Sequence, residues 1–153
     1  EIMPSLVGSE MCIRDSKKLG HIMWEYVGMG RTEEGLKTAL KLLKEIRQEF
    51  ETNLFIPGST EGVNIELEKA LRLNDFITMG ELIAYDALNR NESCGGHFRE
   101  EYQTEEGEAK RDDENYFYVS CWEYQGSDDV APVLYKEPLV YEAIKVQTRN
   151  YKS

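Results

Sequence analysis

Apolar residues recur at helical spacing in three stretches, residues 17–29, 32–50 and 63–89. In each stretch large hydrophobic side chains lie three or four positions apart, with charged residues between them. Thr32 opens the second stretch and two glutamates follow it, which is typical of a helix start. Gly28 lies where the first stretch loses its pattern, as glycine commonly does at a helix end. The pattern therefore predicts three helices that pack as an antiparallel bundle.

Each predicted helix has one face that we expect to be buried. In chain order these faces are Leu19, Ile22, Met23, Tyr26 and Val27; Leu36, Leu40, Leu43, Ile46 and Phe50; and Leu67, Ala70, Leu71, Ile77, Ala84, Ala87 and Leu88. Leu73 and Phe76 fall off the third face, so we expect a second surface of that helix to meet another body. Burying a large apolar side chain contributes about 1.5–3 kcal/mol, so the three faces together can support a folded unit.

The pattern changes in the last third of the chain. Residues 116–124 (YFYVSCWEY) are aromatic and β-branched and predict a strand, and residues 125–129 are typical of a turn. Residues 133–135 and 139–146 predict further strand, interrupted by Pro138 at an edge or a bulge. The predicted fold is therefore mostly α: a three-helix antiparallel bundle followed by a small β-rich C-terminal part (α+β).

The chain divides into three regions on this interpretation. Residues 1–16 include SLVGSEMCIRDS, which resembles the translation of a sequencing adapter and shows no helical or strand period. We expect this region to be an artefact or disordered, and the true sequence to begin near Lys17 as part of a longer one. Residues 17–90 form the predicted helical bundle. Residues 91–153 form a charged loop and a small strand-rich part.

Composition excludes several classes of partner. The 153 residues carry a net charge of −11 and the pI is about 4.7. Nucleic acid requires a basic face, so we expect no nucleic-acid partner, and an acidic chain does not adsorb directly to anionic lipid. No apolar run approaches the length of a membrane span. Three cysteines without a C-x-x-C motif suggest reduced thiols in a reducing compartment.

Residues 89–115 hold more reactive side chains than any other stretch. Cys94 and His97 have the spacing of half a zinc site, but a structural zinc ion needs about four ligands and the chain offers too few. The same two side chains could form a thiolate–imidazole pair, with Gly95 and Gly96 as backbone donors. No complete oxyanion-binding set accompanies them. We therefore assign no catalytic, cofactor-binding or metal-binding residue.

A binding or a purely structural role remains open for the rest of this stretch. His97 and Arg99, beside two glycines, could hold an anion or a carboxylate of another domain, because arginine offers a bidentate fork. The structural alternative, which we favour, is that they fix the loop against its neighbours. Arg111 can pair with a carboxylate, whereas Asp112 and Asp113 belong to a charge run that is typical of solvated surface.

Three segments together carry a family resemblance: residues 23–40, 65–93 and 89–124. They resemble the C-terminal region of the succinate dehydrogenase/fumarate reductase flavoprotein subunit. That family has an E-S-R-G-x-H-x-R pattern followed by R-D-D. The matching residues here are Glu92, Ser93, Gly95, His97, Arg99, Arg111, Asp112 and Asp113. Two positions depart from the pattern: Cys94 stands where many members have arginine, and Glu101 where aspartate is common.

The resemblance implies a role within a larger enzyme that interconverts succinate and fumarate. FAD would be bound by an upstream flavin domain of the full-length subunit, and none by this chain. The implied partners are that flavin domain, an iron–sulfur subunit and, indirectly, a cytochrome b-type membrane anchor. The implied location is cytoplasmic, on the cytoplasmic face of the inner membrane through those subunits. The implied domain or subunit docking residues are Ser93, Gly95, Gly96, His97, Arg99, Arg111, Asp112 and Asp113.

Two alternatives remain open. L-aspartate oxidase shares the same C-terminal architecture, although the W-E-Y and R-D-D-E-N runs look more like the dehydrogenase/reductase branch. The other alternative is a free-standing acidic helical module that binds a partner protein through an exposed helical face.

Overall fold

The computed structural model describes residues 4–59, 61–127 and 130–147. The chain forms two compact units, Glu1–Arg111 (unit 1) and Asp112–Ser153 (unit 2). The predicted boundary lay between residues 90 and 91. The difference arises because the loop after the third helix folds back onto the helices through hydrogen bonds such as that from the Arg99 guanidinium to the Ala87 carbonyl.

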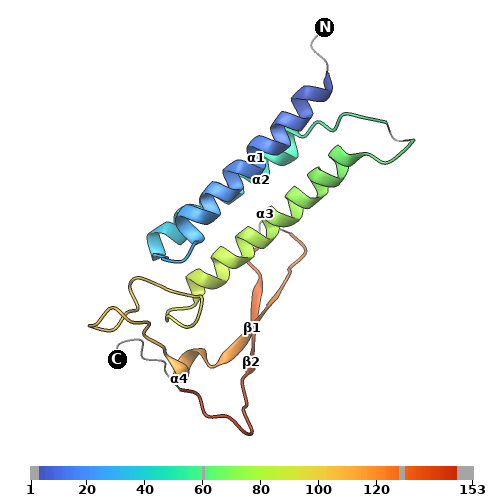
Figure 1. Cartoon of the computed structure of the whole chain (residues 1–153). Coiled ribbons are helices and arrows are strands. Elements are labelled where there is room, and N and C mark those ends of the chain that lie inside the picture. The colour runs from blue at the N-terminus through green and yellow to red at the C-terminus, as the bar shows by residue number, and fades with distance from the viewer. Residues whose placement is uncertain (1–3, 60, 128–129, 148–153) are drawn as a thin grey trace. The chain divides into compact units, whose positions relative to one another are not determined.

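Unit 1 contains three long helices that lie side by side (Figure 1): α1 (Pro4–Val27), α2 (Glu33–Asn53) and α3 (Ile65–Asn89). The Thr32 side chain accepts a hydrogen bond from the Gly35 backbone N–H, which confirms the predicted start of α2. The helical bundle is thus confirmed. Within the described residues, no helix is both long and apolar enough to cross a bilayer.

Helix α1 begins earlier than the sequence predicted. It includes most of the segment that we expected to be an artefact or disordered, although residues 1–3 lie outside the described part of the chain. Two cations of α1 reach the same carboxylate on α2: Arg14 pairs with Glu49, and the Lys18 Nζ lies 2.6 Å from the other Glu49 oxygen. The Arg14 pair joins α1 to α2 before the predicted start at Lys17, and the Lys18 pair lies just after it.

The core lies between the three helices. Its buried members are Leu19, Ile22, Val27, Leu36, Ala39, Leu43, Ile46, Phe50, Ala70, Leu73, Ile77, Ala84 and Ala87. The predicted faces of the first two helices are confirmed, with Met23, Tyr26 and Leu40 half-buried at the margin of the core. Leu36, Leu43 and Ile77 are completely buried.

The predicted face of α3 was partly wrong. Leu67 and Leu71, expected inside, are 42% and 59% exposed, whereas Leu73, expected on an outer face, is 3% exposed. Phe76 does lie outside, at 58% exposed. The error arises because α3 carries apolar residues around most of its circumference, so periodicity alone does not select the face that the other helices cover.

Gly80 is the point where α3 approaches the other two helices. A Cβ atom there would lie 3.1 Å from the Met23 sulfur and 3.5 Å from a Leu19 methyl carbon. We expect Gly80→Leu to destabilise the chain by about 2–3 kcal/mol because the added side chain overpacks the core. Urea denaturation measures this change. Gly20 is the control, since it lies within α1 with open space around it; equal effects of Gly80→Leu and Gly20→Leu would contradict the packing argument.

Unit 2 consists of a short helix, α4 (Asp113–Tyr116), and an antiparallel hairpin of β1 (Tyr118–Glu123) and β2 (Val133–Pro138). The predicted strand at residues 116–124 and the β-rich C-terminal part are confirmed. The sequence missed α4, which starts where the Asp112 carboxylate accepts a hydrogen bond from the Asn115 backbone N–H. None of the described residues of unit 2 is buried.

The predicted strand at residues 139–146 is not present. The ladder stops at Pro138, which pairs with Tyr118 and has no backbone N–H with which to continue. One further hydrogen bond, from Leu139 N–H to Phe117 O at 3.1 Å, closes the hairpin. Residues 140–147 are exposed and form no strand.

Candidate functional site

Backbone hydrogen bonds hold the loop of residues 90–111 to the helical bundle and close the loop on itself. It forms a backbone bridge with the turn between α1 and α2: the Arg31 N–H donates to Phe98 O at 3.0 Å, and the Glu100 N–H donates to Arg31 O at 2.8 Å. The loop also closes on itself where the Ser93 N–H donates to Lys110 O at 2.9 Å. Most of the residues selected from the sequence therefore lie in one ordered segment.

Arg99 is the centre of this segment, at 1% exposed. Its guanidinium Nη1 donates to Ala87 O at 3.0 Å, so the side chain caps the last turn of α3, where backbone carbonyls lack helical partners. Ser93, completely buried, both accepts from the Arg99 N–H at 2.8 Å and donates to Arg99 O at 3.1 Å. The Tyr102 ring lies 5.4 Å from the guanidinium carbon. These contacts join the loop backbone at Ser93 and Arg99 to the end of α3.

Glu101 extends the same network to α2. One carboxylate oxygen accepts from the Arg99 Nε at 3.1 Å and the other from the Glu33 backbone N–H at 2.6 Å. Burial raises the pKa of Glu101, but the hydrogen bonds from Glu33, from its own backbone and from Arg99 outweigh burial and lower it. The sequence noted Glu101 only as a departure from a family pattern. Here the glutamate joins the N-terminus of α2 to the buried arginine.

His97 joins the loop to the α1–α2 turn. Arg31 is a pure donor, so its Nη1, 2.8 Å away, must donate to His97 Nδ1. His97 Nε2 then carries the proton and donates to Arg90 O at 2.9 Å. Partial burial lowers the pKa of His97; the hydrogen bond to Arg90 O opposes this shift, and the charges of Arg31, Arg99 and Arg90 add to it. The imidazole is therefore held neutral, with both ring nitrogens engaged.

We expect the stability of the chain to decrease as the pH falls below about 6.5, the ordinary pKa of histidine. The unfolded chain binds a proton at His97 in that range, and the folded chain does not until its lower pKa is reached. Urea denaturation at pH 7.5 and 5.5 measures the change. His97→Gln can replace both hydrogen bonds without titrating, and should reduce the pH dependence. His21→Gln, at an exposed position of α1, is the control and should leave it in place.

Cys94 to His97 form a tight turn closed by two backbone hydrogen bonds of 2.8 and 3.0 Å. Gly95 has a φ of +58°, which favours glycine. Gly95 and Gly96 are exposed, and a Cβ atom on either would meet nothing within 4 Å. The two glycines therefore form an open tip on an otherwise anchored loop.

The remaining selected residues lie where the two units join in sequence. Arg111 is the last residue of unit 1 and is half-buried. Asp112 and Asp113 belong to unit 2: Asp112 caps α4, and Asp113 is exposed in its first turn. The charge run thus has a local structural function at Asp112 that the sequence did not indicate.

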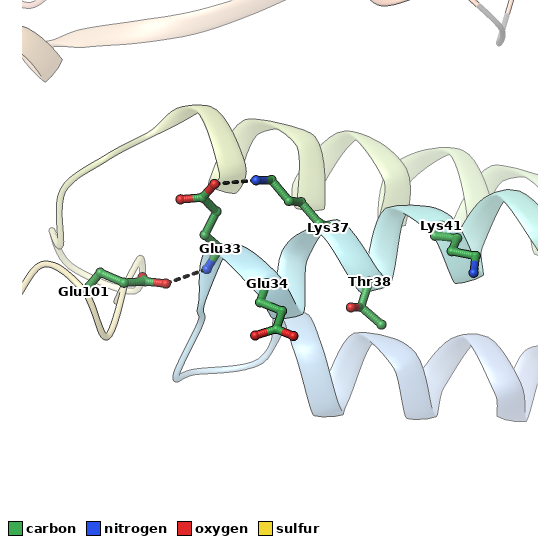
Figure 2. Close-up of a pocket in the computed structure, with 6 residues that line it drawn as sticks. All are labelled: Glu33, Glu34, Lys37, Thr38, Lys41 and Glu101. Atoms are coloured by element: carbon green, nitrogen blue, oxygen red, sulfur yellow. Dashed lines mark hydrogen bonds and ion pairs between the residues drawn. The ribbon is translucent and has the colours of Figure 1, made fainter.

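A shallow pocket of about 560 Å³ lies beside the start of α2 (Figure 2). Its lining residues are Glu33, Glu34, Lys37, Thr38, Lys41 and Glu101. Glu33 pairs with Lys37, and the Glu33 N–H is already occupied by Glu101. The pocket therefore offers mixed, largely neutralised charge, and Glu101 is the only member that belongs to the loop.

Cys94 and His97 contact each other through backbone atoms, and both nitrogens of the imidazole are engaged elsewhere. In residues 4–59, 61–127 and 130–147, no group of three or more potential metal ligands gathers.

Comparison with known proteins identifies the family to which this fold belongs. Residues 16–151 match the family described as the fumarate reductase flavoprotein C-terminal domain. The chain belongs to this family. The match includes the second half of α1, the helices α2 and α3, the loop of residues 90–111 and the hairpin of unit 2. It confirms the resemblance that the sequence carried.

Individual relatives agree with the family. The chain is 30% identical over 109 residues to the fumarate reductase flavoprotein subunit of Proteus vulgaris, covering 71% of this chain and 17% of that protein. It is 38% identical over 86 residues to L-aspartate oxidase 2-b of Nicotiana tabacum, covering 56% and 13%. A chain of the Mycobacterium smegmatis Sdh1 complex is similar at 26% identity and a TM-score of 0.68, covering 83% and 20%. The chain thus spans about a fifth or less of these relatives.

Proposed function

We propose that this chain is the C-terminal part of the flavoprotein subunit of a succinate dehydrogenase/fumarate reductase. The family match over residues 16–151 carries the proposal, and 30% identity to a fumarate reductase subunit over most of the chain supports it. The complete enzyme would interconvert succinate and fumarate, with hydride transfer to or from FAD in the remainder of the polypeptide. The chain itself would hold no flavin, since it carries no Gly-rich dinucleotide motif.

The proposal includes the partners of that enzyme. Electrons would pass from FAD to an iron–sulfur subunit and on to quinone, and a cytochrome b-type anchor would hold the assembly at the cytoplasmic face of the inner membrane. The similar Mycobacterium smegmatis chain comes from a complex, which supports partner subunits. The net charge of −11 disfavours nucleic acid as a partner.

The test is to recover the coding DNA upstream of Lys17 and to express the continuous reading frame. The expected product binds FAD and reduces fumarate with an artificial electron donor, whereas the 153-residue chain does neither. Stoichiometric FAD or fumarate turnover in the pure 153-residue chain would overturn the proposal. A new start codon just upstream would support a free-standing interaction module instead.

L-aspartate oxidase is the second candidate, favoured by the 38% identity to the tobacco enzyme. The two candidates differ in substrate and in assembly. Oxidation of L-aspartate by the complete protein, without copurification of an iron–sulfur subunit, would establish this branch. Fumarate reduction with a copurifying iron–sulfur subunit would exclude it.

Within this function, we propose that the loop of residues 90–111 supports docking. The exposed Gly95–Gly96 tip is a candidate contact, with Arg111, Asp112 and Asp113 further along the chain. The buried Ser93 and Arg99 would act indirectly, by fixing the backbone that carries the tip. His97 would do the same through Arg31 and Arg90.

Replacing these anchors should weaken assembly more than chemistry. We expect His97→Ala or Arg99→Ala in the complete flavoprotein to reduce copurification of the iron–sulfur subunit several-fold, because the tip loses its fixed position. FAD content and fumarate reduction with an artificial donor should change less. Lys41→Ala, on the exposed face of α2, is the control. A variant that assembled normally with FAD and lost only turnover would contradict the docking role.

A further inference from the structure

The residues between Ser93 and Arg99 form a small lobe with a fixed base. At the base, the Ser93 hydroxyl accepts from the Arg99 N–H at 2.8 Å and donates to Arg99 O at 3.1 Å, and both residues are buried. Inside the lobe, Cys94 and His97 exchange two backbone hydrogen bonds. The tip, residues 95 and 96, is exposed. The lobe (residues 94–98) is therefore a unit that can move relative to the bundle without breaking its base.

Among the described residues, Arg31 makes both of the hydrogen bonds that join the lobe to the turn between α1 and α2. The Arg31 N–H donates to Phe98 O at 3.0 Å, and Arg31 Nη1 donates to His97 Nδ1 at 2.8 Å. Arg31 itself is fixed, because its Nε donates to Val27 O and Gly28 O at the end of α1, each at 3.0 Å. A rearrangement between the two sides therefore moves the lobe and not the arginine.

The side-chain contact between Arg31 and His97 requires a neutral imidazole. A guanidinium only donates hydrogen bonds, so it needs the lone pair of His97 Nδ1 as its acceptor. When the ring binds a proton, Nδ1 becomes a donor, and two donors on two positive charges then face each other. The bond from His97 Nε2 to Arg90 O at 2.9 Å survives, because Nε2 carries a proton in either state. Protonation therefore breaks the side-chain contact between the lobe and Arg31.

The charges around the ring add to this conflict. Three arginines act on the imidazole, one from the α1–α2 turn and two from the loop: Arg31, Arg99 and Arg90. A carboxylate accompanies each arginine, in the same order: Asp86 of α3, Glu101 and Glu92. Both ring nitrogens have other partners, so none of these carboxylates hydrogen-bonds the ring. Histidine ordinarily titrates near pH 6.5, whereas aspartate and glutamate titrate near pH 4, so mild acid acts on the histidine first.

We propose that His97 is a pH-sensitive latch that closes the lobe onto the α1–α2 turn. The neutral ring holds the lobe against Arg31, so the exposed tip keeps one position. The protonated ring releases the lobe from Arg31, while the bonds between Ser93 and Arg99 keep its base in place. Mild acid therefore frees the tip without unfolding the bundle. The latch is a property of the fold and does not depend on the proposed function.

Amide hydrogen exchange of the 153-residue chain tests the latch, because the Arg31 N–H loses its acceptor when Phe98 moves away. Exchange is measured by NMR at pH 7.5 and 5.5, at increasing urea concentrations below the unfolding transition, and is corrected for the pH dependence of the chemical step. The Leu43 N–H, in the core of α2, reports global unfolding. The Ser93 N–H, which donates to Lys110 O, reports opening of the whole loop.

Two variants separate His97 from the other titrating groups. His97→Gln removes the titration and can keep both side-chain hydrogen bonds. His21→Gln, at an exposed position of α1, is the matched control.

The expected result is that protection of the Arg31 N–H falls several-fold between pH 7.5 and 5.5. At pH 5.5 its exchange should depend only weakly on urea, because a local opening exposes little surface. The Leu43 and Ser93 amides should keep the steeper urea dependence of larger openings. His97→Gln should remove the pH dependence at Arg31, and His21→Gln should retain it.

Three results would overturn the latch. The first is a pH dependence at Arg31 that survives in His97→Gln. The second is an Arg31 N–H as steeply dependent on urea as Leu43 at pH 5.5, since acid would then act only by unfolding the bundle. The third is weak urea dependence at Ser93 as well, which would mean that the whole loop opens and the base is not fixed. The last two are measured on the unsubstituted chain, so they decide the question even if His97→Gln does not fold.

Discussion

Arg99→Leu should destabilise the chain by about 2–4 kcal/mol, since it removes a buried charged donor and leaves its acceptors unpaired. The carbonyls of Ala87 and Leu88 at the end of α3 would lose their donor, and Glu101 would lose its partner between the loop and α2. Urea denaturation followed by circular dichroism measures the loss. Arg99→Lys should fall between the wild type and Arg99→Leu, because lysine keeps the charge but not the planar fork.

Arg72→Leu is the matched control for this change. Arg72 also forms an ion pair, with its Nη2 atom 2.6 Å from Glu68 Oε1 on the same helix. Both side chains are more than half exposed. An exposed pair contributes about 0–1 kcal/mol, so the control should stay close to the wild type. Equal effects of the two substitutions would mean that Arg99 does not anchor the loop.

Arg47→Leu should lower the free energy of unfolding by about 3 kcal/mol or more, because it leaves the largely buried Glu81 carboxylate without its charge partner. Arg47 is buried on α2, and its guanidinium bonds Glu81 on α3 at 2.6 Å and Thr78 at 3.0 Å. Without the arginine, the three-quarters-buried Glu81 carboxylate loses its charge partner. The free energy of unfolding, from urea denaturation at pH 7, measures the effect.

The double variant Arg47→Leu with Glu81→Leu separates the pair from its surroundings. Replacing both members of a buried ion pair with apolar residues is often nearly neutral, so the double variant should be more stable than Arg47→Leu alone. The difference gives the coupling between the two side chains. A double variant as unstable as the sum of the two single ones would show that the pair is not coupled.

The sequence predicted the buried face of a helix well where one side of the helix is apolar and the other is charged. Helix α2 alternates a leucine-rich face with a charged one, so its core residues were identified correctly. Helix α3 has apolar residues on several sides, and its inner side is selected instead by small residues such as Gly80 and Ala84, which allow close approach. Hydrophobicity alone therefore misplaced Leu71 and Leu73.

The loop shows a second limit of sequence-based prediction. The residues selected within 93–99 do lie together, because they are close in sequence and the turn at Gly95 is local. Their anchors come from elsewhere: Arg31 precedes α2, and the carbonyl that Arg99 caps belongs to α3. Arg47 and Glu81, far apart in sequence, were missed entirely, since nothing local distinguishes them from surface charges.

The same distance affects how the molecule assembles. The backbone bridge between Arg31 and Arg99 joins residues 68 positions apart, across two complete helices. We expect such a contact to form only after the intervening helices are ordered, because the entropy cost of closing a long loop comes before the stabilisation from the contact. We therefore expect the loop to pack onto the bundle late in folding. The amide protons of Arg31 and Glu100, which are held in this bridge, are expected to exchange with solvent when the end of the bundle opens, rather than when a helix terminus frays.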